Sequence, residues 1–106
     1  MDESQFIELA DNVLQKISDK IEEYDEDYTL EVDLLDGILN IELPDGGEYV
    51  INRHDSTQEI WLSSPSSGAS HFAYEEDEEV WMDSNDNELL EMLQNELEVY
   101  INIELY

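Results

Sequence analysis

The sequence predicts an α+β fold in which two helices pack on one face of an antiparallel β-sheet. Apolar residues recur every three or four positions near both ends of the chain, which is the helical period. The segments between them alternate with a period of two, which is typical of strands with one buried face. Turn-forming residues separate these alternating segments. Because 106 residues suffice for one hydrophobic core and not for two, residues 1–106 are expected to form a single domain.

The first helix is expected to start near Glu3, because Asp2 and Gln5 resemble a capping box. Its apolar stripe consists of Phe6, Leu9, Ala10, Val13, Ile17, Ile21 and Tyr24. The acidic residues between the stripe positions therefore face solvent or lie at the margin of the stripe. They are Glu8, Asp11, Asp19, Glu22 and Glu23.

The central segments predict a meander of strands over residues 28–34, 38–43, 48–53, 58–63, 70–74 and 80–83. Asp36-Gly37 signals a tight turn, so the first pair of strands should form a hairpin. Residues 44–47 and 65–68 are Pro- and Gly-containing turns, and residues 75–79 form an acidic connector.

The second helix is expected after Asn85, which resembles another capping box together with Glu88. Its apolar stripe consists of Leu89, Leu90, Leu93 and Leu97. Residues 100–106 alternate apolar with polar or amphipathic side chains, so this closing segment should pack on the body of the domain.

The charge balance limits the classes of partner. The chain has 30 acidic residues and three basic ones, Lys16, Lys20 and Arg53, for a formal net charge of −27. Such a field repels nucleic acid and anionic membrane surfaces, and it attracts cations and basic protein surfaces. We therefore expect no nucleic-acid and no membrane partner.

No motif indicates catalysis. A nucleophile elbow, a phosphate-binding glycine loop and an HExxH motif are all absent, and no motif supports a ferroxidase activity. The lack of cysteine excludes disulfides, thiolate nucleophiles and Cys-ligated metal clusters. An EF-hand starting at Asp25 fails because its sixth position is Leu30 and its twelfth is Asp36.

The segment 58–63 places a tryptophan on the outside of the predicted sheet. Ile60 and Leu62 share one face, so Trp61 points outward if that pair faces the helices, and Asn52 on the neighbouring strand does the same. An outward tryptophan is a candidate binding residue, because this residue type dominates binding hot spots. The alternative is a tryptophan that cross-strand neighbours shield.

The run Val50-Ile51-Asn52-Arg53, followed by QEIWLSSPSSG at residues 58–68, resembles the central signature of the frataxin family, including its bacterial members. The resemblance extends to the acidic first helix, the hairpin at residues 36–39, the strand with Trp81 and the Leu-rich second helix. Two features depart from the family pattern. The chain is more acidic, and Asn85-Asp86-Asn87 replaces a Gly-containing turn.

The resemblance implies a non-catalytic accessory or regulatory protein of iron–sulfur cluster assembly, which docks on the cysteine desulfurase and the scaffold protein. By position, Trp61, Asn52 and Gln58 match the residues of the sheet face that contact this machinery. His54 occupies a position where family members often carry Gln, and His71 one where they often carry Arg or His. The N-terminal residues show no basic region, long apolar stretch or Arg-rich transit peptide, so we expect a cytoplasmic protein, with a mature mitochondrial chain as the alternative. The resemblance further implies a protein that is monomeric without iron and open to metal-dependent oligomers.

The implied ligands of ferrous iron form an acidic ridge on the first helix, the loop after it and the first strand. The acidic ridge consists of Asp19, Glu22, Glu23, Asp25, Asp27, Glu31 and Asp33. Carboxylates without imidazole or thiolate should bind Fe2+ weakly and with little selectivity, which leaves room for Fe3+ and other divalent cations.

An acidic DNA mimic that inhibits a nucleic-acid-binding protein is the alternative from a different class. A dense carboxylate surface can present phosphate-like spacing. This alternative does not account for the signature around Trp61, and it predicts acidic charge over both the helix face and the sheet face.

Overall fold

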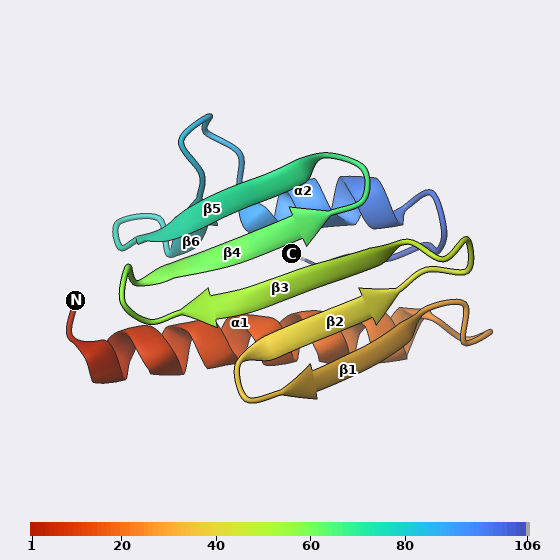
Figure 1. The fold of residues 1–106 in the computed structure, drawn as a ribbon, viewed down its shortest axis with the longest axis horizontal. Coiled ribbons are helices and arrows are strands. Elements are labelled where there is room, and N and C mark those ends of the chain that lie inside the picture. The colour runs from red at the N-terminus through yellow and green to blue at the C-terminus, as the bar shows by residue number, and fades with distance from the viewer. Residues whose placement is uncertain (106) are drawn as a thin grey trace.

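The alternating segments form a six-stranded antiparallel sheet, and both helices cover one of its faces (Figure 1). This computed structural model describes residues 1–105. In chain order, the elements are α1 (Glu3–Tyr24), β1 (Glu31–Leu35), β2 (Ile38–Glu42), β3 (Glu48–His54), β4 (Glu59–Ser64), β5 (Gly68–Glu75), β6 (Val80–Met82) and α2 (Leu89–Leu97). The strands follow one another across the sheet in that order, so the predicted meander and fold class are confirmed.

Helix α1 begins with the predicted capping box. The Asp2 carboxylate accepts a hydrogen bond from the Gln5 backbone N–H at 2.8 Å, and the Gln5 side chain accepts one from the Asp2 backbone N–H at 3.4 Å. The helix ends at Tyr24 without a basic residue in its last turn. Its buried side contains the predicted apolar stripe, of which Leu9 and Tyr24 are only partly buried, and also Leu14 and Ser18, which the prediction did not include.

Strand β1 begins later than the alternation predicts. Tyr28 has a φ of 52°, in the left-handed region, which an extended strand does not allow. The loop takes this path because the Asp25 carboxylate accepts hydrogen bonds from the backbone N–H groups of Thr29, at 2.9 Å, and Leu30, at 2.8 Å. The strand therefore starts at Glu31.

The capping box predicted at Asn85 and Glu88 is wrong. Glu88 is itself the N-cap of α2, and its carboxylate accepts hydrogen bonds from the backbone N–H groups of Leu90 and Glu91. Asn85 lies in the preceding turn, where its backbone N–H donates to Asp83 at 2.8 Å. Because both oxygens of Glu88 serve the first turn of α2, the helix starts after Glu88 and not after Asn85.

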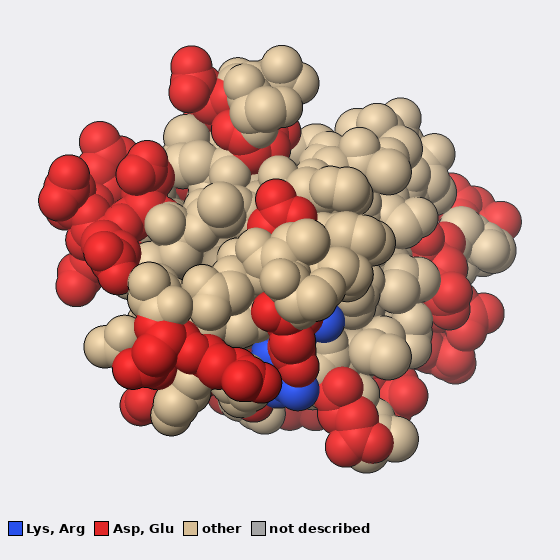
Figure 2. All heavy atoms as spheres, turned by 60° about the vertical axis from the view of Figure 1, so that its left-hand side comes forward, with Lys and Arg blue, Asp and Glu red and all other residues tan. Residues whose placement is uncertain are grey.

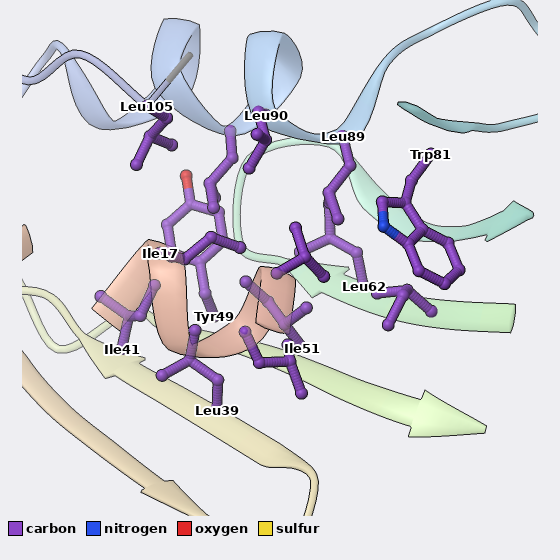
Figure 3. Packing of buried hydrophobic residues seen from close by; sticks show 14 of the residues in the cluster. Ile17, Leu39, Ile41, Tyr49, Ile51, Leu62, Trp81, Leu89, Leu90 and Leu105 are labelled. Carbon is purple, nitrogen blue, oxygen red and sulfur yellow. The ribbon is translucent and has the colours of Figure 1, made fainter. Parts of the chain in front are cut away.

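The hydrophobic core lies between the helices and the inner face of the sheet, as Figure 3 shows. Ile17 of α1 and Leu89 of α2 point toward side chains from alternate positions of the central strands. Those strand side chains are Leu39, Ile41, Tyr49, Ile51, Ile60, Leu62 and Phe72. Within residues 1–105, neither helix is both long and apolar enough to cross a membrane.

The closing segment packs on the domain as predicted. Ile103 and Leu105 are buried, and the Leu105 backbone N–H donates to the Gln94 side chain at 2.7 Å. Tyr106, the last residue of the predicted segment, lies outside the described residues. The contact between Leu105 and Gln94 ties the C-terminal segment to α2.

Candidate functional site

The strand register brings side chains of β1 to β5 into one row across the outer face, which is the sheet face opposite the helices. Leu35 pairs with Ile38, Ile38 with Asn52, Asn52 with Trp61, and Trp61 with His71. Their neighbours along the strands, such as Leu39, Ile51 and Phe72, are buried on the inner face, so the row projects outward. We call these residues the cross-strand row.

The cross-strand row confirms the predicted outward orientation of Trp61 and Asn52 and adds two residues that sequence reasoning missed. Leu35 is 66% exposed and Ile38 is 44% exposed. Their signal in the sequence is weak, because Leu34-Leu35 breaks the alternation of β1. Only the hairpin register shows that Leu35 and Ile38 lie in line with Trp61.

Trp61 is held between two imidazole rings. The His54 ring stacks on one side of the indole, with 3.6 Å between ring centroids, and the His71 ring stacks on the other, with 4.3 Å between centroids. Each imidazole is inclined by 7° to the indole plane. Trp61 therefore points outward, as predicted, and is also shielded by cross-strand neighbours, which was the alternative.

Hydrogen bonds fix this stack. The Trp61 indole Nε1–H donates to the Glu59 carboxylate at 3.0 Å, and His71 Nδ1 lies 4.0 Å from the same oxygen. The hydrogen bond from Trp61 lowers the pKa of the Glu59 carboxyl below its usual value, with smaller contributions from Thr57 and His71, while partial burial opposes the shift. An ionised Glu59 thus anchors the indole edge.

Gln58 lies outside the cross-strand row. It occupies the turn before β4 with a φ of 55°, and its side-chain amide donates to the Met1 carbonyl at 3.1 Å. His54, at the end of β3, is fixed by a contact of 2.8 Å between its Nδ1 and the Thr57 hydroxyl. Of the predicted contact residues, the structure therefore groups His54, Asn52, Trp61 and His71, and directs Gln58 toward the N-terminus.

The middle of the outer face carries little charge. Neutral residues such as Asn40, Val50 and Ser63 surround the cross-strand row. Acidic residues of the outer face stand at strand ends and on the edge strand, at Glu31, Asp33, Glu42, Glu48, Glu59 and Glu75. Figure 2 shows acidic side chains in separate groups at the left and right of the visible surface and in its lower middle beside the basic side chains, with uncharged atoms between the groups.

The acidic ridge extends over the last turns of α1, the following loop and β1. Its members other than Asp25 are exposed. Asp19 accepts a hydrogen bond from Gln15 at 2.9 Å, and Glu23 lies 3.6 Å from the Lys20 ammonium. Among residues 1–105, no group of three or more His, Asp and Glu side chains is close enough to hold a metal ion.

Asp25 differs from the rest of the acidic ridge. It is only 6% exposed, and its carboxylate oxygens accept the backbone hydrogen bonds from Thr29 and Leu30 described above. Its position in a run of acidic residues gives no sign of this burial. In the structure, Asp25 anchors the loop between α1 and β1.

Comparisons with known proteins agree with this fold. A model of the frataxin-like domain matches residues 1–103. The iron-sulfur cluster assembly protein CyaY of Thioalkalivibrio sulfidiphilus is 35% identical over 81 residues, which are 76% of this chain and 75% of that protein.

Solved structures of similar shape cover almost the same residues. Frataxin from Psychromonas ingrahamii superposes with a TM-score of 0.88 and 27% identity over 100% of this chain and 99% of the other. Trimeric frataxin from the yeast Saccharomyces cerevisiae, complexed with ferrous iron, gives a TM-score of 0.78 with 33% identity over 88% of this chain and 85% of the other.

Proposed function

The chain belongs to the frataxin family, and on that premise we propose that it is an iron-binding accessory protein of iron–sulfur cluster assembly with no turnover of its own. Its outer sheet face docks on the complex of cysteine desulfurase and scaffold protein, and its acidic ridge carries ferrous iron. The similarity to an iron-sulfur cluster assembly protein, and to a frataxin complexed with ferrous iron, supports both parts of the proposal.

The cross-strand row carries the docking part of this proposal. Trp61 is the residue type that dominates interface hot spots, and here the stacking of His54 and His71 holds its ring in one orientation. A side chain that is already immobilised loses little conformational entropy when a partner binds. The neutral surroundings of Trp61 provide a face from which a partner can displace water without separating ion pairs.

The iron-binding part of the proposal rests on the exposed carboxylates of the acidic ridge. Because residues 1–105 contain no preformed group of three ligands, each ferrous ion would be held by one or two carboxylates and by water, which makes binding weak and exchangeable. We exclude Asp25 from the ligand set, since its oxygens already accept hydrogen bonds from Thr29 and Leu30. Fe3+ and other divalent cations would occupy the same oxygen ligands.

The distribution of charge disfavours a DNA mimic. Such an inhibitor needs carboxylates across its contact face, whereas the acidic residues of the outer face stand at strand ends and on β1. The helix side and the margins carry the remaining charge, which suits a cation-binding ridge beside a neutral docking face. We further propose a cytoplasmic protein that is monomeric without iron and assembles into oligomers only with metal.

A reconstituted cluster-assembly reaction tests the proposed function. The purified chain is added without oxygen to a desulfurase, its scaffold protein, cysteine and ferrous iron, and cluster formation is followed by absorbance. We expect the chain to bind the complex and to change the assembly rate, and the Asn52→Ala/Trp61→Ala variant to lose both effects. Asn12→Ala, a change at an exposed position of α1 away from the outer face, is the control. Equal behaviour of both variants and the native chain would refute the docking face.

A further inference from the structure

Strand β1 leaves one edge of the sheet open. It pairs with β2 alone, over Glu31 to Leu35, and among residues 1–105 no hydrogen bond from another element reaches it. Figure 1 shows β1 at the margin of the sheet with no neighbour on its outer side. About half of the backbone N–H and C=O groups of an edge strand point to solvent, so β1 can accept a further strand.

The helix side of this edge is only partly covered. Val32 and Leu34 of β1 are half-buried, whereas Leu39 and Ile41 of the adjacent β2 are fully buried. A hollow of about 600 Å³ opens between the end of α1 and β1, and its lining contains the apolar Ile21, Leu30 and Val32 as well as Glu22 and Glu31. Apolar side chains of an added strand would therefore find contacts on this side.

Tyr28 marks the rim of the same hollow. Its side chain is 89% exposed, although tyrosine is large and amphipathic. The left-handed backbone at Tyr28 and the hydrogen bonds from Thr29 and Leu30 to Asp25 hold the loop in place beside β1. An exposed aromatic side chain next to an open edge is suited to contact an incoming segment.

The outer side of the edge selects the charge of that segment. Glu31 and Asp33 project outward and are exposed, while Leu35 ends the strand with an apolar side chain. A second copy of this chain would bring its own Glu31 and Asp33 against them, and like charges across a strand pair are destabilising. Basic side chains at alternate positions would instead pair with both carboxylates.

We propose that β1 is a docking edge for an extended basic segment of another protein, which joins the six-stranded sheet as an additional strand. Alternate Lys or Arg side chains of this segment face Glu31 and Asp33, and the apolar side chains between them cover Val32 and Leu34. Backbone pairing supplies affinity, and the charge pattern supplies specificity. The proposal shares Glu31 and Asp33 with the acidic ridge, but the pairing of backbones along β1 requires neither bound iron nor the function assigned to Trp61.

A synthetic peptide of about seven residues, alternating Lys with Val and blocked at both ends, tests the strand addition. In a titration of 15N-labelled protein at low salt, we expect saturable shifts in β1 and slowing by about tenfold or more of hydrogen exchange at its solvent-facing amides. A peptide N-methylated at every residue keeps the charge and the side chains but has no backbone N–H donor. It should not bind, whereas the unmethylated peptide should.

Matched charge variants test the specificity. Glu31→Lys/Asp33→Lys should weaken peptide binding by about tenfold or more, whereas Glu76→Lys/Glu78→Lys, with the same charge change in the exposed turn after β5, should weaken it far less. Equal binding of the unmethylated and the N-methylated peptide, equal losses in both charge variants, or protection confined to other strands would overturn the proposal. Dimerisation of the native chain in sedimentation that Glu31→Lys/Asp33→Lys abolishes would also overturn it. If this variant fails to fold, the comparison of the two peptides on the native chain still tests the proposal.

Discussion

Arg53 joins the sheet to helix α1 through Asp11, with 2.6 Å between its guanidinium Nη1 and the Asp11 carboxylate. The Arg53 Nε lies 2.7 Å from the Asp55 carboxylate, and the Arg53 backbone N–H donates to the Gly37 carbonyl at 2.8 Å. The side chain of Arg53 is 20% exposed. One of the three basic residues of the chain is thus used where β3, the β1–β2 turn and α1 meet.

Replacing this arginine should test its structural contribution. Arg53→Met removes two charge-assisted hydrogen bonds, so we expect the free energy of unfolding to fall by about 1–3 kcal/mol. Lys16→Met is the matched control, because it removes the same charge from an exposed position on α1. Urea unfolding compares the two variants. Equal losses would mean that Arg53 acts only through net charge.

Trp61→Ala should separate docking from folding. Loss of the stacked contacts with His54 and His71 should lower the free energy of unfolding by less than about 2 kcal/mol, because the ring lies outside the core. Affinity for the desulfurase–scaffold complex should fall by about tenfold or more. Urea unfolding and surface-immobilised binding measure the two effects. A larger loss of stability with unchanged docking would assign Trp61 to the fold and not to the interface.

Acid should release the indole from Glu59. The folded pKa of Glu59 lies below its usual value of 4.5, so the stabilisation that its ionised form provides is present above that value and is lost as pH falls through the lowered pKa. We therefore expect a step in Trp61 fluorescence at a pH below 4.5. Glu59→Gln should remove this step, and Glu48→Gln, another carboxylate at a strand end, should retain it.

Neutralising the exposed part of the acidic ridge should have opposite effects on metal binding and stability. Replacing Glu22, Glu23, Asp27 and Glu31 by their amides should weaken ferrous binding and raise the melting temperature, since the relief of repulsion outweighs the loss of the exposed ion pair between Glu23 and Lys20. The melting temperature of the native chain should rise gradually with sodium chloride, as the Debye length falls to about 10 Å at 0.1 M. Anaerobic NMR titration with ferrous iron measures the first effect. Unchanged shifts in the variant would exclude the acidic ridge as the iron site.

Asp25→Asn should behave in the opposite way to its acidic neighbours. One carboxylate oxygen becomes an NH2 group, which meets a backbone N–H and cannot accept its hydrogen bond, so the free energy of unfolding should fall by about 1–3 kcal/mol. Ferrous binding should change little. Thermal unfolding and the same NMR titration check both expectations. An Asp25 variant that is stabilised would show that repulsion outweighs the hydrogen bonds to Thr29 and Leu30.

The periodicity of apolar residues predicted most of the fold. The capping box at Asp2 and the apolar stripes predicted α1 and the strands, because both depend on neighbours within a few residues. The errors arose where a side chain redirected the backbone. Asp25 turned the loop before β1, and Asp83 and Glu88 together displaced the expected cap of α2. From the sequence alone, these three acidic residues could equally well be exposed to solvent, and no local pattern shows that their carboxylates accept backbone hydrogen bonds.

The sequence predicted to which side of the sheet Trp61 points, but not which side chains contact it. Alternation sufficed to place Trp61 outward, whereas its stacking with His54 depends on a diagonal relation between β3 and β4 that only the register defines. The alignment of Leu35 with Trp61 requires the pairing of several strands at once. Such relations join residues that are distant in the chain, and no local pattern of the sequence encodes them.

The absence of a basic residue from the last turn of α1 has a further consequence. The unpaired carbonyl groups at the end of a helix carry about half a negative elementary charge, which a lysine or arginine of the same helix commonly balances. Here Glu22 and Glu23 lie at that negative pole, and the nearest basic side chain, Lys20 in the preceding turn, lies 3.6 Å from the Glu23 carboxylate. We therefore expect a cation from solution to take the electrostatic role of a missing side chain, and the last turn of α1 to become more ordered as ferrous iron or another divalent cation is supplied.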